Sequence, residues 1–405
     1  MLYSLKTQCG SRSIPILISF LSLLAVATTQ SAMAQTGFDL LRVIRPHQQV
    51  YDLAVGPDGL LYAAVAHGIE VRKTTGELVR EILSSEIEAS LQVDHFGPAA
   101  LAFDEQGVLH VLGTGCGLVA RFENGALTSS FWVGETPRFA YDFAVAADGS
   151  YFISTERTED DSSDVSFVVQ KHDAEGNLLF VIPQESISSD PTASFAALAL
   201  SAQGDLHVLV HAETAVSVEV FSPTGLHLRR LQMPKQVDSD TLYNIFSDRQ
   251  GNIVLNGRLR GREAVLVKYS PTGSIIKMYI GERTSFVAGS IFPFEDLSGA
   301  AFDQAGNLYT STQLSSEPIL AYKPAQYDRI FFRRLPDKRT KDRAAEFTFA
   351  ADRPADVFEC SLDGSAFSVC SSTRRYSGLQ RGTHVFRVRV RGEKRTTETN
   401  RWAVF

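Results

Sequence analysis

The chain has 405 residues, of which 44% are hydrophobic and 21% are charged, and its formal net charge is −7. This composition is ordinary for a soluble globular protein, and the length leaves room for two domains or more. After the first 35 residues no apolar stretch approaches the length that crosses a bilayer, so we expect no transmembrane span in the mature chain.

The N-terminus has the pattern of a signal peptide. Lys6 and Arg12 form a basic start, residues 14–27 are almost wholly apolar, and Ala32-Met33-Ala34 supplies the small-x-small pattern of a cleavage site. The apolar stretch is too short to favour a permanent span. We therefore predict that residues 1–34 are a signal peptide, cleaved near Ala34, and that the protein is secreted or periplasmic.

A short phrase then returns six times: an apolar pair, a polar turn that ends in glycine, and another apolar strand. The anchoring glycines are 48, 42, 55, 47 and 55 residues apart, which is a period typical of propeller blades. A second turn follows within each repeat, so each repeat is predicted to form four antiparallel strands. One blade cannot bury its faces alone, but a closed ring of blades can. The anchoring residues are Gly59, Gly107, Gly149, Gly204, Gly251 and Gly306.

Residues 38–44 resemble the strand that follows the second turn in other repeats, yet no earlier strands precede them. The economical interpretation is that they form the outer strand of the sixth blade and so close the ring. The alternative is that residues 328–334 close their own blade. The repeats as a whole resemble NHL repeats over about residues 37–325. They lack the aspartate usual near the end of the second strand, where Gly113, Thr155, Val210 and Thr312 stand instead.

The segment that follows carries Cys360 and Cys370, ten residues apart, and an oxidising compartment would permit them to pair. Residues 346–370 and 376–389 resemble a bacterial immunoglobulin-like module, over about residues 328–405. This resemblance implies that the two cysteines pair across a hairpin and that residues 328–334 are the first strand of the module. The expected fold is therefore all-β: a six-bladed β-propeller at 37–325, then a small immunoglobulin-like β-sandwich at 328–405.

Charge is distributed unevenly between these two segments. Residues 326–405 carry 17 Lys/Arg and 10 Asp/Glu, whereas the whole chain is negative. Arg387, Arg389 and Arg391 alternate along one predicted strand and so share a face. They could form a basic surface that docks onto an anionic envelope polymer or onto the acidic propeller; the alternative is ordinary strand solubility.

Candidate binding residues stand where the first strand of each blade begins. Seven residues before the anchoring glycine, blades 1, 3 and 5 carry Asp52, Asp142 and Asn244, and the other blades carry small residues. The polar residues follow the tyrosines Tyr51, Tyr141 and Tyr243. This alternation predicts a three-spoked pocket for a cation or a polyhydroxy ligand. The alternative is that these groups only cap strand starts and bond neighbouring backbone amides.

Histidines could signal a metal site. His67 and His211 lie near the mouth of the channel, where they are placed to bind something, whereas His110 and His207 occupy a position that we expect to be core. A zinc lyase would need a third histidine there, and none matches. A metal-dependent lactonase could use Asp52, Asp142 and Asn244.

Two further features are predicted to be structural. Cys116 is expected to be a buried small hydrophobe, and the acidic stretch 156–164 lacks the ligand spacing of a calcium loop and is expected to be solvated.

The sequence thus favours an exported, non-enzymatic binding or scaffolding protein that recognises a protein or carbohydrate ligand or an anionic envelope polymer. We expect no nucleic-acid partner, because no aromatic stacking platform is evident. No cofactor is expected, with a divalent cation as the alternative. Two other functions stay open: a metal-dependent propeller hydrolase or lyase, and a structural envelope protein anchored by its basic tail.

Overall fold

The computed structural model describes residues 38–113, 117–133, 139–158, 165–190, 192–213, 216–234, 237–259, 264–281, 297–312, 318–324, 330–351, 357–391 and 397–405. The predicted signal peptide, Cys116 and residues 159–164 of the acidic stretch lie outside these ranges. Within them no helix is long and apolar enough to cross a membrane.

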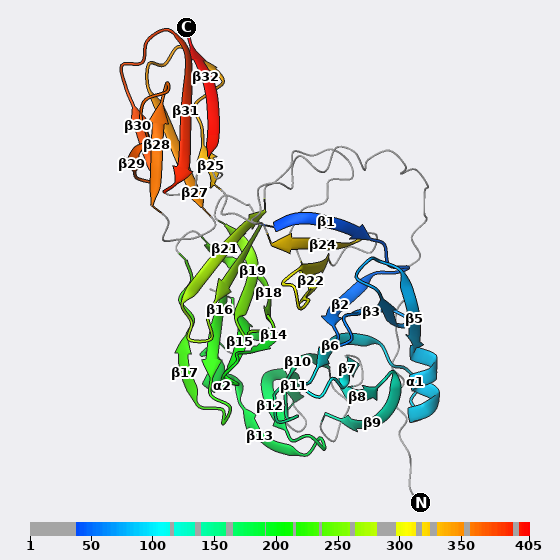
Figure 1. Ribbon diagram of the computed structural model, residues 1–405. Coiled ribbons are helices and arrows are strands. Elements are labelled where there is room, and N and C mark those ends of the chain that lie inside the picture. Colours follow the sequence, from blue (N-terminus) through cyan, green and yellow to red (C-terminus); the bar gives the residue numbers. More distant parts are fainter. Residues whose placement is uncertain are drawn as a thin grey trace, which may run out of the picture.

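The described residues form six four-stranded antiparallel sheets, the blades, which surround a central axis (Figure 1). The predicted all-β propeller is confirmed. The first three blades are β2 (Val50–Val55), β3 (Leu61–Val65), β4 (Gly68–Arg72) and β5 (Leu78–Leu83); β6 (Pro98–Phe103), β7 (Leu109–Gly113), β8 (Leu118–Glu123) and β9 (Ala126–Trp132); and β10 (Ala140–Val145), β11 (Tyr151–Thr158), β12 (Val165–His172) and β13 (Leu178–Ile182).

The fourth and fifth blades have the same strand order, and the sixth takes its outer strand from the start of the chain. They are β14 (Ser194–Leu200), β15 (Leu206–His211), β16 (Val216–Phe221) and β17 (His227–Arg230); β18 (Val237–Ser247), β19 (Ile253–Leu259), β20 (Ala264–Tyr269) and β21 (Ile275–Gly281); and β22 (Leu297–Phe302), β23 (Leu308–Thr312), β24 (Ile319–Pro324) and β1 (Phe38–Ile44). Two short helices, α1 (Ser84–Leu91) and α2 (Gln184–Ile187), follow the first and third blades.

The turn between the first two strands repeats its geometry in every blade. Each anchoring glycine has a φ between +67° and +83°, which only glycine adopts freely. In the first blade the Gly59 amide donates to the Gly56 carbonyl at 3.0 Å, and the Gly56 amide donates to the Leu60 carbonyl at 2.9 Å. The recurring glycine of the sequence therefore marks one conserved turn shape, placed on one face of the ring.

The hydrophobic core lies between neighbouring blades. The second strands β3 and β7 are buried at every residue, whereas the outer strands β9 and β17 have no buried residue. One cluster joins Ala64 and Val71 of the first blade to Leu101 and Val111 of the second. Each blade therefore buries its apolar faces against its neighbours, as the repeat architecture requires.

The strand β1 pairs antiparallel with β24, from Phe38 opposite Pro324 to Ile44 opposite Ile319. Ile44 is buried and belongs to a cluster with residues of the first and sixth blades. The sixth sheet is thus built from both ends of the propeller segment. In contrast, β25 (Ile330–Arg334) pairs with β27 (Ala345–Ala351).

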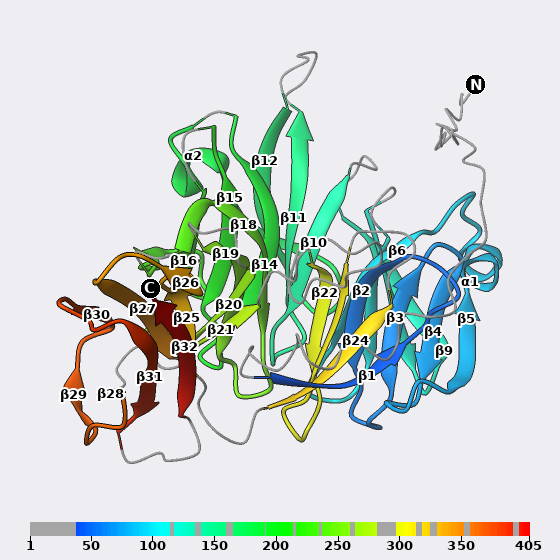
Figure 2. The same cartoon turned by 90° about the horizontal axis from the view of Figure 1, so that it is seen from above.

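The C-terminal residues form a β-sandwich outside the ring, beside the β18–β21 sheet in both views (Figures 1 and 2). Its core stacks Phe347 on Phe386, with ring centroids 4.1 Å apart, and buries Trp402. The predicted disulfide is confirmed: Cys360 and Cys370 are bonded. One sheet is β25, β27 and β30 (Thr373–Tyr376); the other is β26 (Arg339–Thr340), β32 (Glu398–Val404), β31 (Gly382–Val390), β28 (Phe358–Leu362) and β29 (Ser368–Cys370).

Deletion of residues 38–44 should unfold the propeller rather than trim it. Without β1 the strand β24 has an unpaired edge, and the apolar face around Ile44 is exposed. Thermal unfolding monitored by circular dichroism checks this. The control is deletion of residues 330–334, which should damage only the sandwich. A normal propeller transition after the first deletion, with loss of both domains after the second, would contradict the arrangement.

Gly299→Ala should destabilise the propeller at the contact between the sixth and first blades. A Cβ at Gly299 would lie 2.6 Å from the backbone nitrogen of Leu53 and 2.7 Å from Cα of Asp52, which are too close. We expect a loss of about 1–3 kcal/mol in the free energy of unfolding, as for other overpacked cores. Urea denaturation measures it, with Gly97→Ala as control, because the nearest atom there is 3.4 Å away and ends a side chain. Equal stability of the two variants would refute the close approach.

Candidate functional site at the channel mouth

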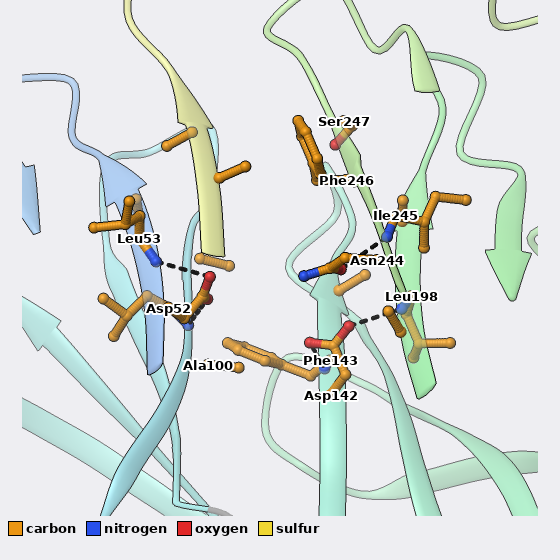
Figure 3. A pocket seen from close by; sticks show the side chains of 18 of the residues that line it. Asp52, Leu53, Ala100, Asp142, Phe143, Leu198, Asn244, Ile245, Phe246 and Ser247 are labelled. Atoms are coloured by element: carbon orange, nitrogen blue, oxygen red, sulfur yellow. Dashed lines mark hydrogen bonds between the residues drawn. The ribbon is translucent and has the colours of Figure 1, made fainter. Parts of the chain in front are cut away.

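A cavity of about 970 Å³ lies on the axis of the propeller and is lined by the innermost strand of all six blades. The predicted residues Tyr51, Asp52, Tyr141, Asp142 and Asn244 line it. In Figure 3 the side chains of Asp52, Asp142 and Asn244 point into the space between these strands. Tyr243 belongs to β18, but only its backbone is described.

Every innermost strand has a β-bulge at the same place. The pairing with the second strand skips one residue in each blade, for example between Val50 and Asp52 and between Ala140 and Asp142. Because the skipped residue leaves the ladder, a bulge redirects its side chain. Tyr51 and Tyr141 are skipped residues, and each is 39% exposed. The skipped residues are Tyr51, Ala99, Tyr141, Ala196, Tyr243 and Ser298.

The carboxylate of Asp52 joins two blades. It accepts a hydrogen bond from the Leu53 amide at 2.7 Å and another from the Leu101 amide of the next blade at 2.8 Å. Asp142 repeats this contact, with the amides of Phe143 at 2.8 Å and Leu198 at 2.7 Å. The carboxylate oxygens of Asp52 and Asp142 therefore bond neighbouring backbone amides, which is the second of the two roles that the sequence suggests for them.

Asn244 makes the same tie between the fifth and sixth blades with different chemistry. Its Oδ1 accepts from the Ile245 amide at 2.7 Å, and its Nδ2 donates to the carbonyls of Leu297 and Ser298 at 3.4 Å each. The matching positions in the even blades are Ala100, Ala197 and Gly299, all small. The polar residues Asp52, Asp142 and Asn244, here called the spokes, therefore alternate with small residues around the channel.

Burial in the channel sets the electrostatics of the two carboxylates. Desolvation raises the pKa of Asp142 to about 7, although its two backbone hydrogen bonds act in the opposite direction. Desolvation likewise raises the pKa of Asp52 well above its ordinary value, and the negative charge of Asp142 adds to this increase. The two groups therefore repel each other across the cavity.

The histidines divide between the cavity and the rest of the protein. His211 lines the cavity, and its Nε2 is buried with no hydrogen-bond partner among the residues that the structure describes. Burial lowers the pKa of His211, so the ring is neutral at pH 7. His67 is exposed in the turn between β3 and β4 and does not line the cavity. His110 and His207 are fully buried, as expected.

Two residues at the mouth were missed in the sequence. The Tyr141 hydroxyl donates to the carboxylate of Glu156, and the Tyr141 ring lies 5.5 Å from that of Phe167. Glu156 comes from the next strand, β11, and Phe167 from β12. These contacts fix one aromatic ring at the rim and add a third carboxylate there.

Among the described residues, the side chains that bring three metal-ligand atoms within 4.8 Å of one another are His47, Glu70 and Glu81. This group does not line the cavity. Glu70 is buried and already bonds Arg72 at 2.7 Å, so its charge is compensated without a metal. Asp52, Asp142 and His211, which line the cavity, do not form such a group.

The predicted basic surface lies on the outer face of β31. Arg387 and Arg391 are exposed, but Arg389 bonds Glu359 at 2.8 Å and lies 4.0 Å from the Phe367 ring. Arg391 lies 3.9 Å from the same glutamate. Glu359 therefore offsets part of the positive charge on this face.

No protein-family model matches the chain, and no curated protein matches it. Among solved structures, an extracellular domain from B. thetaiotaomicron is 12% identical, with a TM-score of 0.46, and the alignment covers 90% of this chain and 58% of that one. A gluconolactonase from Xanthomonas campestris is 16% identical, with a TM-score of 0.47 and 74% and 92% coverage. Virginiamycin B lyase from Staphylococcus aureus is 10% identical, with a TM-score of 0.46 and 71% and 99% coverage.

The channel carboxylates should make the propeller less stable as the pH rises. Asp142 has an ordinary pKa of 3.8 when unfolded and one of about 7 when folded, so the folded state binds more protons between these values. Its contribution to stability is therefore present below pH 3.8 and is lost as the pH rises through about 7.

Asp142→Asn removes this titration and leaves one acceptor oxygen where Asp142 has two, a loss of one hydrogen bond that is the same at every pH. The difference in unfolding free energy between the wild type and this variant should change by about 3 kcal/mol from pH 4.5 to pH 8, in favour of the variant at pH 8. Urea denaturation at both pH values measures it, and the loss of the Asp142 charge lowers the pKa of Asp52 in the variant, which acts in the same direction. Parallel pH profiles would contradict the raised pKa.

Proposed function

We propose that this chain is an exported, non-enzymatic binding protein that recognises a ligand at the mouth of its propeller channel. The supporting observation is the cavity of about 970 Å³ with Tyr51 and Tyr141 turned out of their strands at its rim. Small-molecule sites have volumes of about 300–1,000 Å³ and combine aromatic walls with a few polar groups. A protein side chain or a carbohydrate would also fit such a mouth.

The bonding of the polar spokes favours binding over catalysis. Asp52 and Asp142 hold backbone amides of two blades each, so these carboxylates are fixed by the fold. Nucleophilic catalysis by a hydroxyl or thiol needs a base within hydrogen-bond reach. Among the described lining residues, His211 makes no hydrogen bond to a serine.

The proposal also includes the identity of three segments of the chain. We propose that residues 1–34 are a signal peptide, that residues 37–325 are an NHL-like propeller and that residues 328–405 are an immunoglobulin-like module. The Cys360–Cys370 disulfide supports an oxidising compartment, and therefore export. The exposed Arg387 and Arg391 support weak, salt-sensitive contact of the module with an anionic envelope polymer.

Replacing both rim tyrosines should abolish ligand recognition without unfolding the protein. Tyr51→Ser and Tyr141→Ser remove exposed rings from bulges, so the strand pairing stays intact. A thermal-shift screen of sugars and small amines identifies binders, and each single variant should weaken binding about tenfold or more. The control is Leu178→Ser, which removes a 53% exposed side chain on the outer strand β13.

Equal affinity in the tyrosine variants and the control would reject the channel mouth as the site. Metal analysis of the purified protein tests the hydrolase or lyase alternative. Stoichiometric zinc or calcium that is lost on Asp52→Asn or Asp142→Asn would favour that alternative over a binding protein.

A further inference from the structure

We infer that the channel mouth binds a primary ammonium group in the part of the cavity that Asp52, Asp142 and His211 line, with the two carboxylates as its counter-charge. This inference rests on the proposed function and names the chemical class of its ligand. An organic cation with N–H donors, such as an amine or a lysine side chain, is the ligand that these groups complement.

The first argument is uncompensated charge. Within the part of the chain that the structure describes, neither Asp52 nor Asp142 forms an ion pair, although both face the cavity. Among the described lining residues the one arginine is Arg249, and its guanidinium donates to the Gly56 carbonyl at 3.2 Å. Arg249 lies in the turn after β18, beyond the end of the strand that carries Asn244, and its guanidinium is directed to the turn of the first blade that contains Gly56.

The second argument is the repulsion between the two carboxylates. Asn244 joins its blades as a neutral amide because the next blade offers it carbonyls. At Asp52 and Asp142 the next blade offers an amide N–H, so both carboxylate oxygens act as acceptors, and each tie brings a negative charge to the cavity wall. Two desolvated charges that repel each other reduce stability, and a bound cation would relieve that repulsion.

The third argument is the hydrogen-bonding character of the site. A carboxylate has about four acceptor positions, and each spoke uses two of them for backbone amides. The backbone of Leu242 forms a hydrogen bond with His211 that raises the pKa of the ring, as a carbonyl acceptor does. Because the proton of the neutral ring is used in this bond, Nε2 carries no proton and is an acceptor. The free positions are thus acceptors, and an ammonium supplies three donors.

The rim suits the same ligand. Tyr51 and Tyr141 precede the two aspartates on the bulges, and the negative face of an aromatic ring attracts a cation. Glu156, which accepts from the Tyr141 hydroxyl, adds negative charge beside that ring. A neutral polyol would leave both carboxylates without a counter-charge, and the described residues of the cavity include no group of three converging His, Cys, Asp or Glu ligand atoms for a bare metal ion.

Three probes that share a benzyl group distinguish the effect of positive charge from the effect of N–H donors. They are benzylammonium, which has both, benzyltrimethylammonium, which has only the charge, and benzyl alcohol, which is neutral. Isothermal titration with the purified protein should give benzylammonium the highest affinity, about tenfold or more above benzyl alcohol, with benzyltrimethylammonium between them. Asp52→Asn and Asp142→Asn should each weaken benzylammonium binding about tenfold and leave benzyl alcohol within about twofold. Glu105→Gln, an equal charge change at the other end of the channel, should alter neither.

A spoke variant that fails to fold does not end the test. His211→Leu leaves the ties between blades intact and should still weaken benzylammonium more than benzyltrimethylammonium. Equal affinity for benzylammonium and benzyl alcohol would overturn the inference, as would 1:1 calcium binding that displaces benzylammonium. If a neutral sugar binds in a way that depends on Tyr51 and Tyr141, the proposed function survives and this inference fails; if the tyrosine variants change no binding at all, both fail.

Discussion

The hydrogen bonds that run from polar side chains of one inner strand to the backbone of the next are the constraint on which the channel depends. Asp52, Asp142 and Asn244 each tie an odd blade to the even blade that follows. At the remaining interfaces, small residues let the next strand approach closely, as Gly299 does toward Asp52. The ring therefore alternates two kinds of contact, and the six blades have an approximate threefold pattern at the mouth.

This arrangement makes structure and recognition share the same atoms. A carboxylate that holds two amides is fixed in direction, so its remaining lone pairs are preorganised for a ligand. The cost is desolvation, which raises the pKa of both aspartates. Asn244 avoids that cost because its partners in the next blade are carbonyls, whereas the partners of Asp52 and Asp142 are amide N–H groups, which need a second acceptor oxygen.

The sequence was informative wherever local chemistry decides the structure. Recurring glycines predicted the blades because each occupies the same positive-φ turn, and two cysteines ten residues apart predicted the disulfide. The tyrosine-aspartate pairs were found by their spacing, but their bulges were not, because a bulge is a property of pairing between two strands. The bond from Asp52 to Leu101, 49 residues away, likewise depends on tertiary register. Register also decides that His211 lines the cavity and His67 does not.

Binding of an ammonium at this mouth would be linked to protonation and to folding. A cation beside Asp142 favours the ionised carboxyl, so its pKa must fall from about 7 when the ligand binds. Near neutral pH the complex would then release protons, because the free protein carries some that the bound one does not. The same ligand binds only the closed ring, since Asp52, Asp142 and His211 come from three different blades. Ligand binding would therefore stabilise the ring by removing the repulsion that the empty channel retains.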